Sequence, residues 1–461
     1  MTFDIRKIFE ERNGENYDLH SRYINPQFAR VLKTIGYDKS YTTAKGPILR
    51  DREGNEYLDF LSGYGVYAMG RNHPTMKKVL HDFLEMDIAN LVQMEGPLLS
   101  GLLAEALVKK LNLPGVDTVF FTNSGTEANE GAIKYVRAAT GRERILFFDH
   151  AFHGLSTGSL SMNGCNAFRD GFGKLLSGCE KIPFNDTDRL EKELKRGDVA
   201  ALFFEPIQGK GVFVPEDSFL PEVQKLCRKK GTLFVADEVQ TGLGRTGKWF
   251  GHQHWNLEPD IVTIAKALSG GMVPVGAILC RRAIYDKVFS RMDRCVVHSS
   301  TFGQNNLAMV CGLASLSIIE EEGLVENARV MGEKILGGLK KIAAESEWIS
   351  EVRGKGLMIG IEFDKPQSLS SKLKWNLIHQ LNASLFGELI VMALMSRHRI
   401  LAQVSGHEQE IVKILPPLVI DETHAGRFLT AFASVMADCG KVTGPIWQMG
   451  KNLMREAAAQ G

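Results

Sequence analysis

The stretch that decides the fold is Thr232–Ala267, which reads TLFVADEVQTGLGRTGKWFGHQHWNLEPDIVTIAKA. Two short apolar runs, Thr232–Ala236 and Ile261–Ala265, have the length and β-branched content of buried parallel strands. Asp237 follows the first run and Lys266 follows the second. Because ligands bind outside the carboxyl ends of strands in an open parallel sheet, we expect this carboxylate and this amine at the same rim.

An amine paired with a carboxylate suits the cofactor pyridoxal 5'-phosphate (PLP). A lysine binds PLP as a Schiff base, and an acid partners the pyridinium nitrogen. The alternative is two strand-terminal charges that face solvent, and neither charge taken singly decides between the two interpretations. The rest of the sequence has to distinguish them.

Further apolar runs of strand length alternate with helical patterns through the middle of the chain. The other expected strands are Thr118–Thr122, Ile145–Phe148, Ala200–Phe204 and Val275–Leu279. Helical patterns such as Glu127–Ala139 and Pro221–Lys230 lie between them. This alternation is typical of α/β proteins, in which helices cover both faces of a mostly parallel sheet.

The composition excludes several classes of function. Of 461 residues, 55 are Lys or Arg and 54 are Asp or Glu, so no global field favours nucleic acid or an anionic membrane. Seven scattered cysteines without a CxxC pair predict neither a disulfide framework nor a metal site. The first residues mix charges and lack an apolar core, so we expect no secretory signal, and the longest apolar stretch is too short to span a bilayer. We expect a cytoplasmic protein with no membrane segment and no nucleic-acid partner.

A phosphate-binding pattern stands at 122–130, where TNSGTEANE follows an expected strand and opens a helix. Ser124 and Glu127 have the spacing of a capping box. Gly125 allows close approach of the backbone, and free N–H groups at a helix start attract a phosphate. An ordinary helix cap is the alternative. The position of the pattern in the same sheet as the lysine and the carboxylate favours the phosphate site.

With these motifs in hand, the sequence resembles the class III PLP-dependent aminotransferases, which include ornithine, acetylornithine, putrescine and 4-aminobutyrate aminotransferases. The matching segments follow family order over nearly the whole chain: LDFLSGYG (58–65), NSGTEANE (123–130), FHG (152–154), EPIQG (205–209), DEVQTGLGRTG (237–247), AKALSGG (265–271), STFGQN (300–305) and VRGKGL (352–357). The resemblance implies PLP fold type I, with a mostly parallel seven-stranded sheet flanked by helices in a large α/β domain. It also implies a smaller α+β domain formed from both chain ends.

The expected domain bounds follow from this resemblance and from a change of pattern near Gly323. Residues 1–60 form an N-terminal segment of the small domain, residues 61–322 the large PLP-binding domain, and residues 323–461 the C-terminal small domain.

The resemblance also implies roles at the cofactor. Lys266 forms the Schiff base and moves protons, and because both tasks need an unprotonated amine, a lowered pKa is expected. Asp237 partners the pyridinium nitrogen, and Gln240 hydrogen-bonds the phenolic oxygen of the ring. Phe152 stacks on the pyridine ring. The remaining expected cofactor-binding residues are Ser124, Gly125 and Thr126 at the phosphate, with His153 and Glu205 beside the ring.

Three further roles concern the substrate and the assembly. Thr301 would reach the phosphate of the neighbouring subunit, which implies a homodimer with a shared active site. Arg353 would bind the carboxylate of an amino or keto acid through a two-pronged hydrogen bond, the alternative being a surface arginine. Tyr64 would line the substrate pocket.

Two features depart from the family. Ornithine-type members carry a glutamate after EPIQG that pairs with the carboxylate-binding arginine, whereas this chain has Lys210. A strict ornithine assignment is therefore in doubt, and we expect Lys210 to point to solvent, with attraction of an acidic substrate group as the alternative. The apolar stretch 377–399 contains Leu389–Met395. We expect it to form a core helix or dimer surface, the alternative being a vestibule for a lipophilic substrate.

Taken together, the sequence predicts a PLP-dependent ω-aminotransferase with a ping-pong mechanism. The keto-acid pair is expected to be glutamate and 2-oxoglutarate. The other substrate is expected to be a terminal amine or aldehyde: a diamine, a basic amino acid or a long-chain, lipid-like aldehyde. Two alternatives stay open: an aminomutase or decarboxylating enzyme of the same fold, and a non-catalytic PLP-fold binding protein.

Overall fold

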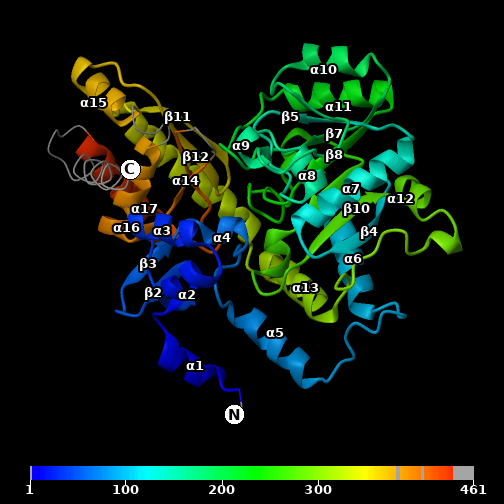
Figure 1. Cartoon of the computed structure of the whole chain (residues 1–461), viewed down its shortest axis with the longest axis horizontal. Helices are drawn as coiled ribbons and strands as arrows, with labels where there is room; N and C mark the ends of the chain where they lie inside the picture. The colour runs from blue at the N-terminus through cyan, green and yellow to red at the C-terminus, as the bar shows by residue number, and fades with distance from the viewer. Residues whose placement is uncertain (1–2, 380–384, 406–409, 440–461) are drawn as a thin grey trace.

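A computed structural model describes residues 3–379, 385–405 and 410–439 (Figure 1). The chain forms a larger region around a seven-stranded sheet and a smaller region that holds two four-stranded sheets. In Figure 1 the green and cyan elements of the larger region lie to the right, and the blue N-terminal strands lie beside the orange C-terminal elements to the left.

The large sheet has the order β4-β10-β9-β8-β7-β5-β6. Its strands are β4 (Val116–Thr122), β5 (Arg144–Phe148), β6 (Cys179–Ile182), β7 (Val199–Phe204), β8 (Leu233–Asp237), β9 (Ile261–Ile264) and β10 (Gly276–Arg281). Only β10 is antiparallel to its neighbours, and the other pairs are parallel. The expected mostly parallel seven-stranded sheet is confirmed. Central strands such as β7 and β9 are buried at every residue because helices cover both faces.

Strand β6 is the one strand of this sheet that the apolar pattern did not indicate. Its sequence is CEKI, and only Ile182 is fully buried. The strand lies at the edge of the sheet beside β5, and its other three residues are partly or fully accessible. Charged residues are common on such edges, so the apolar signal was absent.

The helices of the larger region begin with α5 and end with α13. They are α5 (Pro74–Glu85), α6 (Leu98–Leu111), α7 (Gly125–Thr140), α8 (Thr157–Ser161), α9 (Asn166–Arg169), α10 (Thr187–Leu194), α11 (Phe219–Lys230), α12 (Arg282–Val288) and α13 (Asn306–Glu321). Helix α7 has the expected cap, since the Ser124 side chain accepts a hydrogen bond from Glu127 N. It ends at Gly141, whose φ of +66° is the left-handed conformation that closes many helices.

The smaller region joins the two ends of the chain. One sheet holds β1 (Tyr41–Lys45), β2 (Ile48–Asp51), β3 (Glu56–Asp59) and β13 (Ile400–Leu401). The other holds β11 (Ile349–Lys355), β12 (Met358–Phe363), β15 (Ile411–Ile414) and β14 (Gln403–Val404). Because β13 pairs in parallel with β3, a C-terminal strand completes an N-terminal sheet. The expected α+β region from both ends is confirmed, while the bounds at residues 60 and 322 stay predictions.

The remaining helices pack in and around the smaller region. They are α1 (Ile5–Arg12), α2 (Asn16–Tyr23), α3 (Pro26–Thr34), the short α4 (Ser62–Gly65), α14 (Leu324–Ala344), α15 (Leu369–His379), α16 (Leu385–His398) and α17 (Glu422–Cys439). The apolar run Leu389–Met395 lies in α16 and is buried throughout, so it is a core helix. Residues 380–384 of the apolar stretch lie outside the described residues. None of the described helices is long and apolar enough to cross a membrane.

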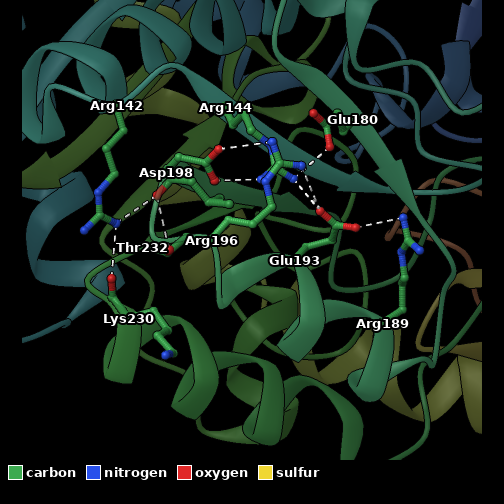
Figure 2. Close-up of polar contacts among 10 residues, drawn as sticks. Arg142, Arg144, Glu180, Arg189, Glu193, Arg196, Asp198, Lys230 and Thr232 are labelled. Carbon is green, nitrogen blue, oxygen red and sulfur yellow. Dashed lines mark hydrogen bonds and ion pairs between the residues drawn. The ribbon is translucent and has the colours of Figure 1, made fainter.

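A buried arginine fixes the rim of the large sheet at the amino ends of its strands (Figure 2). Arg144, at the start of β5, donates to Glu180 at 2.7 Å, Glu193 at 2.6 Å and Asp198 at 2.7 Å. Arg189 shares Glu193 at 2.8 Å. Glu193 is buried, so Arg144 supplies the charge that compensates it.

We expect Arg144→Met to destabilise the protein by about 3–5 kcal/mol, because it leaves the buried Glu193 carboxylate without its main partner. The matched control is Arg189→Met, which removes a half-exposed partner of the same carboxylate and should cost less than about 1 kcal/mol. Urea unfolding of both variants measures this. Equal small losses for the two variants would contradict the proposed role of Arg144.

Candidate active site

A cavity of about 860 Å³ lies at the carboxyl ends of the large-sheet strands, between that sheet and strands β14 and β15. This volume falls within the range of roughly 300–1,000 Å³ that is usual for small-molecule sites. Most of the expected site residues line it: Tyr64, Ser124, Gly125, Thr126, Phe152, His153, Glu205, Asp237, Gln240 and Lys266. Thr301 and Arg353 do not line it.

Asp237 is the most firmly held charge in the cavity. It ends β8, and its Oδ2 accepts hydrogen bonds from Asn129 Nδ2 at 2.7 Å and from His153 Nδ1 at 2.8 Å. Its Oδ1 accepts a hydrogen bond from Val239 N at 3.0 Å. Three donors hold this carboxylate in a fixed orientation, which suits a partner for a cationic ring nitrogen.

His153 is fully enclosed beside this carboxylate. Burial alone would lower the pKa of His153, but the hydrogen bond to Asp237 and the charges of Asp237 and Glu205 outweigh burial and raise it. A protonated His153 strengthens the anchoring of Asp237, because the imidazolium donates to the carboxylate as a charge-assisted hydrogen bond.

Lys266 lies two residues beyond the end of β9 and faces the same cavity. Burial lowers the pKa of Lys266 and the ammonium of Lys210 adds to this, while the charges of Asp237 and Glu205 oppose it. The net direction is the one that a nucleophilic and basic lysine needs. The φ of Lys266 is +45°, a left-handed conformation that non-glycine residues seldom adopt outside functional sites.

The N-terminus of α7 forms a cradle for an anion. Gly125 begins the helix, and a Cβ at that position would stand 2.8 Å from a methyl carbon of Val239, so the approach requires glycine. Thr126 lines the cavity beside it, and its hydroxyl lies 2.6 Å from the hydroxyl of Ser159. Free backbone N–H groups and the helix dipole favour a phosphate here. The residues therefore fit PLP at both of its poles, with the acid at the ring nitrogen and the cradle at the phosphate.

Glu205 holds two loops together beneath the cavity. Its Oε1 accepts from Phe152 N at 2.9 Å, and its Oε2 accepts from Gly209 N at 2.7 Å. Burial raises the pKa of Glu205, the nearby His153 lowers it, and the net shift is upward. Glu205 thus positions the Phe152 ring and the segment that leads into Lys210.

Tyr64 lies in a strained turn at the cavity mouth. Ser62, Gly63 and Tyr64 have φ values of +44°, +61° and +60°, so α4 is a left-handed turn rather than a regular helix. Asp59 stabilises this turn by accepting hydrogen bonds from Leu61 N at 3.1 Å and Ser62 N at 2.6 Å. Strain of this kind is characteristic of functional loops whose geometry the surroundings impose.

Arg353 is the expected site residue that the structure places elsewhere. Its guanidinium pairs with Glu351 and Glu362 and donates to the carbonyls of Val212 at 3.1 Å and Gly211 at 2.8 Å. All of these partners lie outside the cavity lining, and the arginine is buried against them. The geometry argues against Arg353 as the carboxylate-binding residue and makes it an anchor for the 211–212 loop.

Lys413 is a cavity residue that the sequence analysis missed. It lies in β15, is buried, and donates from Nζ to Gly209 O at 2.5 Å and to Gln240 Oε1 at 2.8 Å. Burial lowers the pKa of Lys413 well below its usual value, and the charges of Lys210 and Lys266 lower it further. A lysine inside the apolar run Ile411–Ile414 was the available signal, since a charge in a buried strand requires a function or a partner.

Asn129 was also missed. It lies on α7 one turn beyond Gly125, so it faces the same side of the helix. Besides its bond to Asp237, its Oδ1 accepts from Thr263 Oγ1 at 2.9 Å and its Nδ2 donates to His153 O at 2.7 Å. The i, i+4 spacing within NSGTEANE was the signal that pointed to it.

Two more expectations can be compared with the structure. Lys210 lines the cavity, so the expectation that it points to solvent is wrong. Thr301 is exposed and lies outside the cavity of its own chain. Its contact with a neighbouring subunit stays a prediction.

Comparison with known proteins agrees with this geometry. A family profile described as "Aminotransferase class-III" matches residues 35–436. The putrescine aminotransferase of Pectobacterium atrosepticum is 35% identical, over 92% of this chain and 89% of its own length. The aminotransferase PigE of a Serratia species is also 35% identical, over 91% of this chain but only 53% of its own length, so the chain spans about half of that relative.

Solved structures show the same fold. The ornithine aminotransferase of Toxoplasma gondii, which carries PLP at partial occupancy in its active site, has a TM-score of 0.82 at 26% identity and covers 96% of this chain and 100% of its own. An engineered thermostable ω-transaminase has a TM-score of 0.80 at 25% identity and covers 90% of this chain and 96% of its own. The fold is PLP fold type I, and the cofactor of the cavity is pyridoxal 5'-phosphate.

The contact between Asp237 and His153 predicts how the pKa of His153 changes when the carboxylate is removed. In Asp237→Asn the carboxylate that raises the pKa of His153 is lost while burial remains, so this pKa should fall and the imidazole should lose its proton at lower pH. NMR of histidine-labelled protein measures this shift, and a His153→Gln spectrum assigns the signal. An unchanged His153 titration would contradict the contact.

Proposed function

The chain belongs to the class-III aminotransferase family and is a PLP-dependent aminotransferase, and from this premise we propose that it moves an amino group between a terminal amine and a keto acid. The proposed keto-acid pair is glutamate and 2-oxoglutarate, used in alternating half-reactions. The observation that carries the proposal is a cavity in which Lys266, Asp237 and Lys413 meet, where Lys413 forms no ion pair with any carboxylate among the described residues.

In this proposal PLP, when bound, supplies the ring that accepts the electrons of the substrate carbanion. Lys266 would hold the cofactor through its amine, and the same amine would remove and return the proton at the reacting carbon of the substrate. Asp237 keeps the ring nitrogen protonated. Phe152 covers one face of the ring, and Gln240 contacts its phenolic oxygen. Ser124, Gly125 and Thr126 hold the phosphate.

In this proposal Lys413, rather than Arg353, binds the carboxylate of the substrate. An ammonium has three donors, and Lys413 uses two of them on Gly209 and Gln240, which leaves one N–H for a ligand. No described carboxylate forms an ion pair with it, so a substrate carboxylate would be its first counter-ion. Arg245, buried nearby without a described carboxylate partner, adds to the positive potential.

A homodimer with a shared site is part of the proposal. Thr301 and its neighbour Phe302 are exposed, and Phe302 is 60% accessible. Other large apolar side chains between Leu84 and Leu102 are exposed as well, including Met94 at 96%. Exposed apolar surface of this extent favours burial against a second copy of the chain.

The candidate amines are a diamine, a basic amino acid and a long-chain substrate, and the lining of the cavity bears on each of them. Helix α16 is buried and contributes nothing to the described cavity lining, so it gives no support to a lipid-like substrate. The cavity nonetheless has an apolar wall of its own, formed by Val66, Leu155, Phe168, Met272 and Val273.

The proposal is tested by titrating the PLP-loaded protein with glutamate, putrescine, 4-aminobutyrate, β-alanine and a long-chain alkylamine while its absorbance is recorded. A donor replaces the band of lysine-bound PLP with that of pyridoxamine phosphate. Response to glutamate and to at least one terminal amine is the expected result. If no donor changes the band, net amino transfer is excluded and the proposed function is wrong.

Lys266→Ala should retain PLP through the phosphate cradle and Asp237 but lose amino transfer. Loss of the base alone should slow the reaction by about 10²–10⁴-fold. Single-turnover absorbance with glutamate measures the loss, and PLP content after gel filtration is the control. Turnover at the wild-type rate in this variant would remove Lys266 from its assigned role.

Lys413→Met should weaken binding of the keto acid, whereas Arg353→Met should lower the stability of the fold. Lys413→Met should raise the KM for 2-oxoglutarate by at least about tenfold, the scale of one charge-assisted hydrogen bond of about 1.5–3 kcal/mol. Arg353→Met should instead lower the unfolding temperature, because it leaves Glu351 and Glu362 without their partner.

The same residue predicts a pH dependence. The pKa of Lys413 is lowered, so its ammonium is lost as pH rises through a value below the usual 10.4 or so. Affinity for 2-oxoglutarate should therefore weaken with rising pH in the wild type and weaken less in Lys413→Met. Equal pH dependence in both proteins would contradict the assignment of Lys413.

A further inference from the structure

The side chain of Lys210 lies against two aromatic rings at the cavity wall. Its Nζ lies 5.2 Å from the ring centroid of Phe152 and 5.0 Å from that of Phe168. The two rings themselves meet edge to face, with centroids 5.5 Å apart. Cation–π contacts of this kind hold an ammonium in place without neutralising it.

The backbone around Lys210 is pinned on both sides. Gly209 donates its N–H to Glu205 and accepts from Lys413 at its carbonyl. Gly211 donates to Ser405 Oγ at 2.9 Å and accepts from Arg353. A flexible surface lysine would need none of these contacts. A side chain that binds a ligand binds it more tightly when it is already held in position, because less conformational entropy is lost on binding.

The charges at this wall are unbalanced. Lys210 and Lys413 both line the cavity, and no ion pair joins either one to a carboxylate in the part of the chain that the structure describes. The nearest cavity carboxylates are already engaged, since Glu205 accepts two backbone N–H groups and Asp237 accepts three hydrogen bonds. Burial lowers the pKa of both lysines, and the nearby charge of Lys210 lowers the pKa of Lys413 further.

From this wall we infer that Lys210 is a specificity-determining residue that excludes diamines and admits an amine whose far end is a carboxylate or an uncharged chain. The inference rests on the proposed function, because it names the class of amine used in that reaction. A second ammonium would lie against the Lys210 and Lys413 cations, while a carboxylate would bind them and an alkyl chain would contact Phe152 and Phe168. Position 210 therefore supplies no carboxylate that could neutralise this wall in either half-reaction.

The test uses three donors with the same reacting amine and similar length: putrescine, butylamine and 4-aminobutyrate. For the PLP-loaded wild type, single-turnover kcat/KM for putrescine should lie at least about tenfold below that for the other two donors, because like charges oppose each other in a partly desolvated site. Wild-type protein that uses putrescine as efficiently as butylamine would overturn the inference.

Two variants assign the effect to one side chain. Lys210→Met keeps an apolar stem against both rings and removes the charge, so the penalty against putrescine should shrink to within about threefold. Lys210→Glu should reverse the order and favour putrescine. The matched control is Lys225→Met, the same substitution on the exposed face of α11, which should keep the wild-type ranking. A ranking in Lys210→Met equal to that of the control would overturn the inference.

A binding measurement separates this inference from the proposed function. Glutarate cannot react, and its dissociation constant for the PLP-loaded protein, measured by calorimetry, should rise about tenfold in Lys210→Met and stay unchanged in Lys225→Met. If glutarate binding depends on Lys210 but no amine discharges the cofactor, the anion-recognising role stands and the proposed function fails. If amines discharge the cofactor while Lys210→Met changes neither glutarate binding nor donor ranking, the function stands and the inference fails.

Discussion

The rest of the site depends on the Asp237 carboxylate at the end of β8. Three donors from different parts of the fold, Asn129 on α7, His153 after β5 and the backbone of Val239, fix this charge. Two of these donors come from elements that form cavity walls: α7 carries the proposed phosphate cradle, and the loop after β5 carries the Phe152 ring. Lys266, two residues beyond the end of the neighbouring strand β9, lines the same cavity as this carboxylate.

A second constraint comes from the loop that crosses between the two regions. Glu205 holds Gly209, Lys413 reaches the same residue from β15, and Arg353 holds Gly211. These contacts join the large sheet to the smaller region and also aim Lys210 into the cavity. The hydrogen bonds that link the two regions thus also position the residues that line this side of the cavity. This double role explains why so many charged groups are buried there.

The sequence predicted the parts of the site that follow from local rules. Asp237 and Lys266 were predicted because the carboxyl ends of parallel strands converge, and the cradle was predicted because a capped helix follows a strand. The motif around Arg353 did not show which way its side chain turns, because that depends on two carboxylates close in sequence and on two carbonyls much earlier in the chain. Lys413 was missed because a single charge in an apolar strand was taken as part of the sheet, and β6 because its edge position relaxes the apolar pattern.

The most direct test of this account is a crystal structure of the PLP-loaded protein with glutarate bound. The account predicts the ring nitrogen of PLP against Asp237, its phosphate at Gly125 and Thr126, and a glutarate carboxylate within hydrogen-bond distance of Lys413 Nζ. A structure with the carboxylate bound elsewhere, and with Lys413 still engaged only by Gly209 and Gln240, would contradict the account.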